Sequence, residues 1–387
     1  MLTRTTSAVL PRGRNSLTLR VRGRSIGTQS KFKIGSLKPR FPLEIIETIV
    51  GFVLLLHPFP KSGFLAIRSF TQGSKMLREI SLRLYFRDVL LDDRALFVKV
   101  WDYLSTENAV FGGSNSFGWV RSLIGPSHIV ASSAIKNIGS FVNLKTLELS
   151  FASEGSSTQD SVIHRLLDSF LHSPSRNILE KLALTEVPHV DAKLLESLSG
   201  MFPRLESLEL GSTKRIESDC CIVCMEDSLV DIRHSPIPDY YANAEKLATS
   251  FARSLAPMSR LKHLYLGLLL SDAYALEDHL THSDEAKGGR GVVTSFSSCL
   301  TCDRLREETQ RREWLVSLSL SRALPSLDTI RWDTLFTSLA RGRTESDEDG
   351  FYYASDDGFL QVPSAVTFLI HRHTGSGEVR TMIPVHS

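Results

Sequence analysis

Two pairs of potential metal ligands stand close together in the second half of the chain. The segment "HLTH" supplies His279 and His282, and "CLTC" supplies Cys299 and Cys302, giving the spacing H-x2-H-x16-C-x2-C. Two imidazoles and two thiolates form a tetrahedral ligand set for zinc. Because four protein ligands leave no open position, such a zinc ion would be structural and would stabilise an insertion rich in glycine and serine. The alternative is that each pair simply lies at i, i+3 on a helix surface.

A second cysteine cluster, "DCCIVCMED", resembles the opening of a RING finger through its C-x2-C spacing. A RING finger needs further Cys and His ligands close by, whereas the next C-x2-C begins 75 residues after Cys224. This gap argues against a true RING finger, and a zinc-binding ubiquitin ligase that uses the cysteines directly is kept as an alternative function. The acidic segment "ESDEDGFYYASD" departs from a calcium-binding loop at its first and last positions, which favours a charged surface loop.

The common catalytic signatures are missing from the sequence. The segment "FGGSNSFG" lacks the Lys and the Ser or Thr of a phosphate-binding loop, and neither a G-x-S-x-G elbow nor a dinucleotide fingerprint occurs. The body of the chain has no basic stripe interleaved with aromatic residues, which argues against nucleic-acid binding. We therefore expect a protein that is not an enzyme and that binds no cofactor other than a structural zinc ion.

The composition is that of a globular protein, since 42% of the 387 residues are hydrophobic, 23% are charged and the net charge is +2. The apolar stretch "FPLEIIETIVGFVLLLHPFP" is too short to cross a membrane, because its uncharged run covers only residues 48–56 and a spanning helix needs about 20 residues. Five cysteines, an odd number, and no obvious signal peptide favour reduced thiols. These features predict a cytoplasmic or nuclear protein.

The first 40 residues form a basic segment. They contain ten Arg and Lys residues, and no acidic residue precedes Glu44. This bias, together with many Ser residues, is typical of a mitochondrial transit peptide, which leaves a mitochondrial location as an alternative. The other interpretation is a disordered basic tail over residues 1–39 that adds weak affinity for acidic surfaces.

A leucine pattern of the form L-x-x-L-x-L, or a near variant, recurs from residue 143 onward. The five copies are "NLKTLELS", "ILEKLALT", "RLESLELG", "RLKHLYLG" and "SLDTIRWD". The first leucine of each copy is, in order, Leu144, Leu179, Leu205, Leu261 and Leu327. The last two gaps between copies are about twice as long as the first two. Amphipathic helical patterns precede most copies, so short strands and helices are expected to alternate.

A repeated βα unit of this size cannot bury both of its faces alone. Neighbouring units are therefore expected to stack their strands into a parallel sheet with the helices outside, which is a solenoid architecture. A plain α/β core is the alternative. In the predicted strands the leucines point inward and the residues between them face the open surface. The open-face residues are expected to be Thr146, Glu148, Ser150, Ser207, Glu209, His263, Tyr265, Thr329, Arg331 and Asp333.

Two further elements are predicted at the ends of this region. Apolar residues at i, i+3, i+4 and i+7 predict a helix over residues 42–56, with Pro42 in its first turn. Near the C-terminus, "AVTFLIHRHTGSGEVRTMIPV" contains two apolar strand patterns around a glycine-containing turn, which predicts a hairpin. The hairpin is expected to cap the last repeat.

The combined features resemble an F-box protein with degenerate leucine-rich repeats. The segment "FPLEIIETIV" resembles the first helix of an F-box, "SKMLREISLRLYFRDVLL" resembles its closing segment, and the repeats over residues 141–333 resemble the leucine-rich region. The resemblance implies an F-box that docks the Skp adaptor of a cullin-RING ubiquitin ligase, an SCF complex, and repeats that bind a protein substrate. It also implies that Pro42, Leu43, Ile45 and Ile46 face the adaptor.

The expected fold class is α/β: a short all-α F-box-like module followed by an irregular leucine-rich-repeat-like βα solenoid. The expected parts are a basic tail over residues 1–39, the F-box-like module over 40–90, the solenoid over 91–342, and an acidic loop with the hairpin over 343–387. The best candidates for substrate contact on the open face are Glu148, Glu209, His263, Tyr265 and Arg331. A non-catalytic leucine-rich scaffold is a further alternative function.

Overall fold

The computed structural model describes residues 42–57, 59–110, 115–131, 137–212, 236–237, 240–271, 302–334, 364–372 and 379–386. The chain divides between Ile45 and Ile46 into two units. The elements described below belong to the second unit, apart from the first residues of helix α1. The predicted ligands His279, His282 and Cys299 lie outside the described residues, as do the basic N-terminal segment and the "DCCIVCMED" cluster.

Four helices and one strand occupy residues 43–110. The helices are α1 (Leu43–Leu56), α2 (Pro60–Gly73), α3 (Lys75–Tyr85) and α4 (Arg94–Val110). The predicted helix over residues 42–56 is confirmed by α1. Pro60 opens α2, where the fixed φ of proline suits the first helical turn. The Ser74 side chain then caps α3 by accepting a hydrogen bond from the backbone N–H of Leu77 at 3.2 Å.

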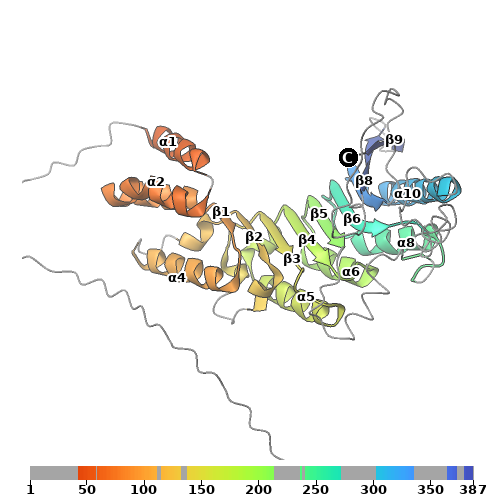
Figure 1. Cartoon of the computed structure of the whole chain (residues 1–387), viewed down its shortest axis with the longest axis horizontal. Coiled ribbons are helices and arrows are strands. Elements are labelled where there is room, and N and C mark those ends of the chain that lie inside the picture. The colour runs from red at the N-terminus through yellow and green to blue at the C-terminus, as the bar shows by residue number, and fades with distance from the viewer. Residues whose placement is uncertain are drawn as a thin grey trace, which may run out of the picture. The chain divides into compact units, whose positions relative to one another are not determined.

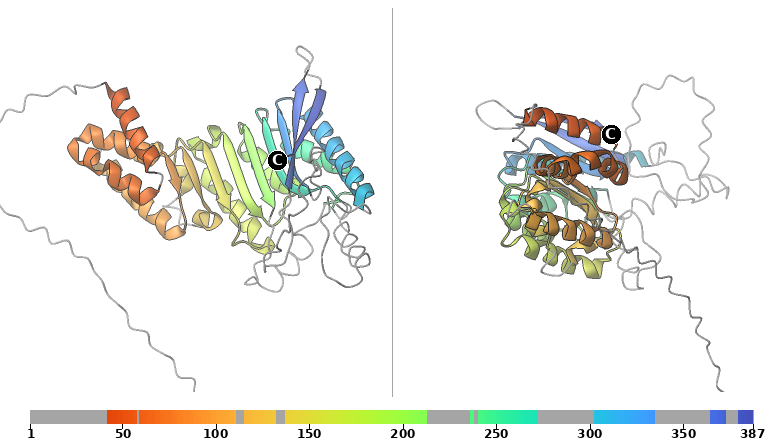
Figure 2. Two further views of the ribbon diagram at one scale, coloured as in Figure 1. Left: turned by 45° about the horizontal axis from the view of Figure 1, so that its top comes forward. Right: turned by 90° about the vertical axis from the view of Figure 1, so that its left-hand side faces the viewer.

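The described strands form one nine-stranded sheet whose order follows the chain. The strands are β1 (Asp88–Leu90), β2 (Ser122–Pro126), β3 (Thr146–Ser150), β4 (Lys181–Val187), β5 (Ser207–Ser212), β6 (His263–Leu269), β7 (Thr329–Thr334), β8 (Ser364–Arg372) and β9 (Val379–His386). Strands β1 to β7 run parallel, and β8 and β9 continue the sheet in antiparallel pairing. Figure 2 shows the strands side by side in this order.

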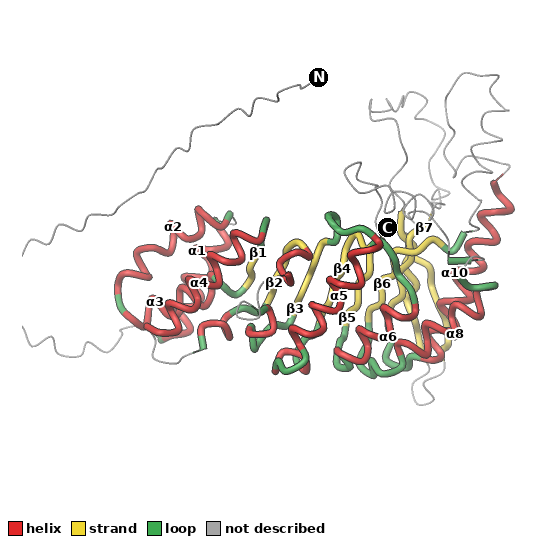
Figure 3. Tube along the Cα trace, turned by 90° about the horizontal axis from the view of Figure 1, so that it is seen from below, coloured by secondary structure: helices red, strands yellow, loops and turns green. Residues whose placement is uncertain are grey.

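Helices cover one face of the sheet. Figures 1 and 3 show α5 (Ser156–Phe170), α6 (Ala192–Met201) and α8 (Ala244–Leu255) along this face, and α10 (Asp303–Ala323) follows near the antiparallel strands. Short 3-10 helices stand at η1 (Ser116–Trp119), η2 (Ser127–Ala131), η3 (Ile138–Ser140) and η4 (Pro174–Asn177). Two of the long helices begin at residues whose side chains accept a backbone N–H: Asp191 from Leu194 at 2.7 Å, and Asn243 from Lys246 at 2.9 Å. The structure is thus a mixed α/β fold with a mainly parallel sheet.

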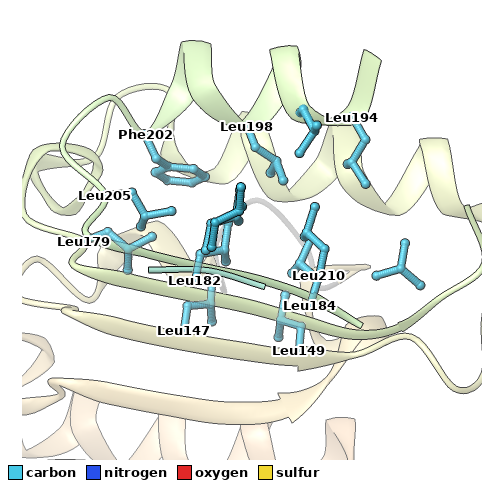
Figure 4. Packing of buried hydrophobic residues seen from close by; sticks show 14 of the residues in the cluster. Leu147, Leu149, Leu179, Leu182, Leu184, Leu194, Leu198, Phe202, Leu205 and Leu210 are labelled. Carbon is cyan, nitrogen blue, oxygen red and sulfur yellow. The ribbon is translucent and has the colours of Figure 1, made fainter. Parts of the chain in front are cut away.

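The repeated leucines build the core between sheet and helices. In β3, Leu147 and Leu149 are fully buried while Thr146, Glu148 and Ser150 between them are partly exposed. The same alternation occurs in β2 and β5, whereas in β4 Ala183 between Leu182 and Leu184 is also fully buried. Figure 4 shows leucines of these strands packing against the side chains of α6. Each fully buried leucine contributes about 1.5–3 kcal/mol to stability. The spacing of the leucine pattern therefore decides which face of each strand meets the helices.

One close backbone approach requires glycine. A Cβ atom on Gly139, in η3, would lie 1.8 Å from the carbonyl oxygen of Ser169, near the end of α5. The short helix can approach α5 so closely only because residue 139 has no side chain. The hydroxyl of Ser173 donates a further hydrogen bond to the carbonyl of Gly139. This contact fixes the end of α5 before strand β4.

The structure confirms some predicted elements and corrects others. All five leucine-pattern segments form strands (β3 to β7), and the predicted C-terminal strand pair is confirmed by β8 and β9. Strand β2 and helix α4 were not predicted. The prediction that Asp333 is open to solvent is wrong, because Asp333 is 3% exposed and its strand is flanked by both β6 and β8. Among the described helices, none combines the length and the apolar character needed to span a bilayer.

Candidate binding surfaces

The sheet face opposite the helices carries a row of side chains in lateral register. In parallel pairing Glu148 lies beside Ala183, Ala183 beside Glu209, Glu209 beside Tyr265, and Tyr265 beside Arg331, and Ile124 stands at the other end next to Glu148. We call these residues the open-face row, in which Ala183 is fully buried and the others are partly or well exposed: Ile124, Glu148, Ala183, Glu209, Tyr265 and Arg331. Four of the five predicted substrate-contact residues are therefore brought into one line. The fifth, His263, stands in the adjacent row beside Thr329.

Tyr265, Arg331 and Asp333 form a connected group at one end of the open-face row. The hydroxyl of Tyr265 donates a hydrogen bond to Oδ1 of Asp333 at 2.7 Å. The guanidinium of Arg331 lies over the Tyr265 ring, 4.9 Å from its centroid, which is a cation–π arrangement. Burial raises the pKa of Tyr265, and the neighbouring Asp333 carboxylate raises it further. Tyr265 therefore stays protonated and keeps its hydrogen bond to Asp333.

In the middle of the row, Glu209 forms an ion pair with Lys181 of the neighbouring strand. Nζ of Lys181 lies 2.8 Å from the Glu209 carboxylate, and both side chains are about one-third exposed. Glu148, two strands away from Glu209, has no cationic partner among the described residues. Beside this row, Nδ1 of His263 and the Thr329 hydroxyl share a hydrogen bond at 2.9 Å.

A separate ladder of charges runs along the amino ends of the strands. Lys145 pairs with Glu180 at 2.5 Å, and Lys262 pairs with Glu206 at 2.8 Å. The hydrogen bond from Lys262 lowers the pKa of Glu206. Since these ion pairs are exposed, they add little to stability. Each of these two pairs joins the residues that precede adjacent strands of the sheet.

Helix α1 carries an apolar stripe on its exposed side. Ile45, Ile49, Phe52 and Leu56 follow the i, i+4, i+7, i+11 spacing of one helix face, with exposed fractions of 45%, 45%, 62% and 77%. We call these four residues the α1 stripe. Leu55 and Phe59 add further exposed apolar surface nearby in the chain. A contiguous exposed apolar patch of this kind marks an interaction surface more often than an ordinary protein exterior.

The other side of α1 is held in place. Val50 is fully buried, and Glu47 forms an ion pair with Arg83 of α3. A Cβ on Gly63, in α2, would lie 3.1 Å from the carbonyl oxygen of His57 and 3.5 Å from the Leu54 side chain, so α2 passes close to the end of α1. The helix therefore presents the α1 stripe from a fixed position within this part of the chain.

The residues expected to face the adaptor lie at the start of α1. Pro42, Leu43 and Ile45 are exposed, and Ile46 is partly buried. The exposed surface extends further along the helix than expected, since Ile49, Phe52 and Leu56 continue it. The sequence contained a signal for this longer apolar surface, because Ile49, Phe52 and Leu56 follow Ile45 at the spacing of one helix face. Periodicity alone does not decide which of two apolar faces is buried.

Of the predicted zinc ligands, only Cys302 lies within the described residues. It is buried at the N-cap of α10. In the part of the chain that the structure describes, no group of three or more His, Cys, Asp and Glu side chains is placed to hold a metal ion. The zinc set of His279, His282, Cys299 and Cys302 stays a prediction from spacing.

A titratable group also lies in the core, away from both surfaces. Glu313, on α10, is 2% exposed, and Oε1 of its carboxyl has no hydrogen-bond partner within the described structure. Burial raises the pKa of Glu313 to about 8, while a hydrogen bond with the Thr334 side chain opposes this shift. Nearby, the indole N–H of Trp332 donates to the Ser317 hydroxyl at 2.8 Å. The Glu313 carboxyl is enclosed in the core and takes no part in either candidate binding surface.

The chain was also compared with known proteins. Neither protein-family models nor the sequences of curated proteins gave a match.

Proposed function

We propose that the protein is a substrate-recruiting adaptor of an SCF-type cullin-RING ubiquitin ligase. In this proposal the start of α1, with Pro42, Leu43, Ile45 and Ile46, docks the Skp adaptor as part of an F-box-like module. The sheet that follows belongs to a leucine-rich-repeat-like solenoid and binds a protein target through its open face. The protein performs no bond chemistry itself and acts in the cytoplasm or nucleus.

The observation that carries the proposal is the exposed apolar surface of α1. An apolar helix face with anchors at i, i+3 and i+4 binds a partner by lying in a hydrophobic groove. Burying Ile49 or Phe52 fully in such a groove would contribute about 1.5–3 kcal/mol for each side chain. Their present exposure of 45% and 62% leaves much of this free energy available to a partner.

The open-face row supports the second half of the proposal. Tyr and Arg are enriched at the residues that dominate protein interfaces. Tyr265 and Arg331 are already ordered by their mutual stacking and by the hydrogen bond to Asp333. An ordered side chain loses less conformational entropy when it binds, so the affinity per contact is higher.

Two alternatives remain from the sequence. A zinc-binding ubiquitin ligase would contain stoichiometric zinc and would transfer ubiquitin from a charged conjugating enzyme without other ligase subunits. A leucine-rich scaffold, whose helical start serves only as a cap, would show no adaptor contact and, in its mitochondrial form, a cleaved N-terminus. Each alternative therefore differs from the proposal in a measurable property.

The test is a pull-down of purified Skp adaptor with the full chain and with the variants Leu43→Asp and Ile45→Asp, at positions that are 46% and 45% exposed. Both variants place a charge on an exposed position, so folding should be retained and can be checked by circular dichroism. The matched control is Leu171→Asp, because Leu171 is also apolar and 48% exposed but follows α5. The proposal expects binding by the parent and the control and loss of binding by both α1 variants. Absence of binding by the folded parent would refute it.

A further inference from the structure

Two unpaired charges of opposite sign stand near opposite ends of the open-face row. Arg331 is exposed, and no carboxylate pairs with it among the described residues, although its guanidinium is held over the Tyr265 ring. Glu148 is partly exposed and also lacks a partner there, because Lys181 on the neighbouring strand β4 pairs with Glu209 instead. Charges left unpaired on an ordered surface determine the charge pattern of the partner that fits it.

The sheet register sets the separation of these two charges. From Glu148 on β3 to Arg331 on β7 there are four strand intervals, passing Ala183, Glu209 and Tyr265. Neighbouring strands lie about 4.8 Å apart, so the two charges are about 19 Å apart. An extended polypeptide rises about 3.3 Å per residue and covers this distance in about six residues. Residues six apart in an extended chain point to the same side.

We propose that the open-face row binds an extended polypeptide segment that lies across the strands, with a basic side chain at Glu148 and an acidic side chain about six residues away at Arg331. This names the chemistry of the target and rests on the proposed function only in assuming that the target is a protein. Lys181 and Glu209 form an ion pair with each other beneath the middle of the segment. They therefore favour neither a basic nor an acidic side chain at the central positions of the bound segment.

The side chains around each charged end suit this ligand. Next to Glu148, Ile124 is 36% exposed and offers an apolar surface for the methylene stem of a Lys or Arg side chain. At the other end, the exposed Arg331 guanidinium lies over the Tyr265 ring, and its planar fork suits two parallel hydrogen bonds to a carboxylate. A Lys at position 331 would lack this planar fork.

The experiment measures fluorescence anisotropy of labelled peptides of about ten residues with the full chain. The first peptide has one arginine and one glutamate six positions apart in a serine and alanine background, and the others carry two arginines, two glutamates or no charge at these positions. We expect the mixed-charge peptide to bind at least about tenfold more tightly than the uniform ones. Equal binding of all four peptides, or no binding of the mixed-charge peptide up to about 1 mM, would overturn the inference.

Charge reversal supplies a second readout. Arg331→Glu presents two carboxylates and should switch the preference to the two-arginine peptide, and Glu148→Arg should switch it to the two-glutamate peptide. The matched control is Arg204→Glu, an equal change of net charge at an exposed residue outside the row. Reversal variants that keep the original preference would overturn the inference. The peptide assays contain no Skp adaptor, so the two proposals can fail separately. If the chain binds the adaptor but shows no peptide preference, only the inference is refuted. If it shows the peptide preference but does not bind the adaptor, only the proposed function is refuted.

Discussion

The buried carboxyl of Glu313 makes the stability of the protein depend on pH in a defined direction. Its pKa is about 8 in the folded protein, against an ordinary value of 4.5. Between these two values the folded protein keeps the proton while the unfolded chain releases it. Because the folded state binds more protons, the free energy of unfolding falls as pH rises, by about 1.4 kcal/mol per pH unit. Below pH about 4.5 and above about 8 the contribution of Glu313 becomes constant.

The variant Glu313→Gln isolates this effect. Glutamine has no proton to lose, so the variant should lack the slope. At pH 7, about 2.5 units above the unfolded pKa, the carboxyl reduces stability by about 3 kcal/mol. The new amide N–H group near the unpaired Oε1 position costs about 1–3 kcal/mol if it stays unsatisfied. We therefore expect Glu313→Gln to be equally stable or more stable than the parent at pH 7 and less stable at pH 5.

Urea unfolding followed by circular dichroism between pH about 5 and 8 measures both curves. The matched control is Glu307→Gln, since Glu307 lies exposed on the same helix. The control should keep the pH slope of the parent. If the stability curves of Glu313→Gln and the parent ran parallel over this range, Glu313 would not be the buried titrating group, and the reasoning would be refuted.

Two further predictions concern the backbone. Gly139→Ala should lower the free energy of unfolding by about 2–3 kcal/mol, because the new Cβ meets the Ser169 carbonyl. The control Gly200→Ala, in α6 with open space around the Cβ position, should raise the free energy of unfolding by up to about 1 kcal/mol. Thermal unfolding compares the two variants, and equal effects would contradict the close approach of Gly139 to Ser169. Glu186 has a φ of 56° and accepts a hydrogen bond from Ser150 at 2.8 Å. Glu186→Gly and Glu186→Ala both remove this bond, but only Ala keeps the backbone strain of a positive φ. Glu186→Gly should therefore be more stable than Glu186→Ala by about 1 kcal/mol in urea unfolding. Equal stabilities of the two variants would argue against backbone strain at residue 186.

The strands and their faces could be read from the sequence because both are local properties. The leucine spacing places Leu147 and Leu149 on one side of β3 and Glu148 on the other, whatever the neighbours are. The same rule put Glu209, Tyr265 and Arg331 on the open face. Strand β2, "SLIGP", was missed because it has no leucine pattern and forms only through pairing with β1 and β3. Helix α4 was missed because its apolar residues show no single clear face.

The arrangement of charges needed the tertiary structure. Lys181 has carboxylates on both neighbouring strands, Glu148 and Glu209. Only the folded geometry decides that it pairs with Glu209 and leaves Glu148 without a cationic partner in the part of the chain that the structure describes. The burial of Asp333 likewise follows from the pairing of β7 with a strand more than 30 residues later in the chain.

The sequence by itself determined the α/β class, the leucine-bearing strands and the amphipathic character of α1, because each depends on a repeat of two or about 3.6 residues within one segment. Only the tertiary structure decided which side of α1 is exposed, how Lys181 and Glu209 pair on the sheet, and that the Glu313 carboxyl is enclosed in the core. These properties depend on contacts between residues far apart in the chain. Their energies are set by burial and by distance in space, which no local spacing contains.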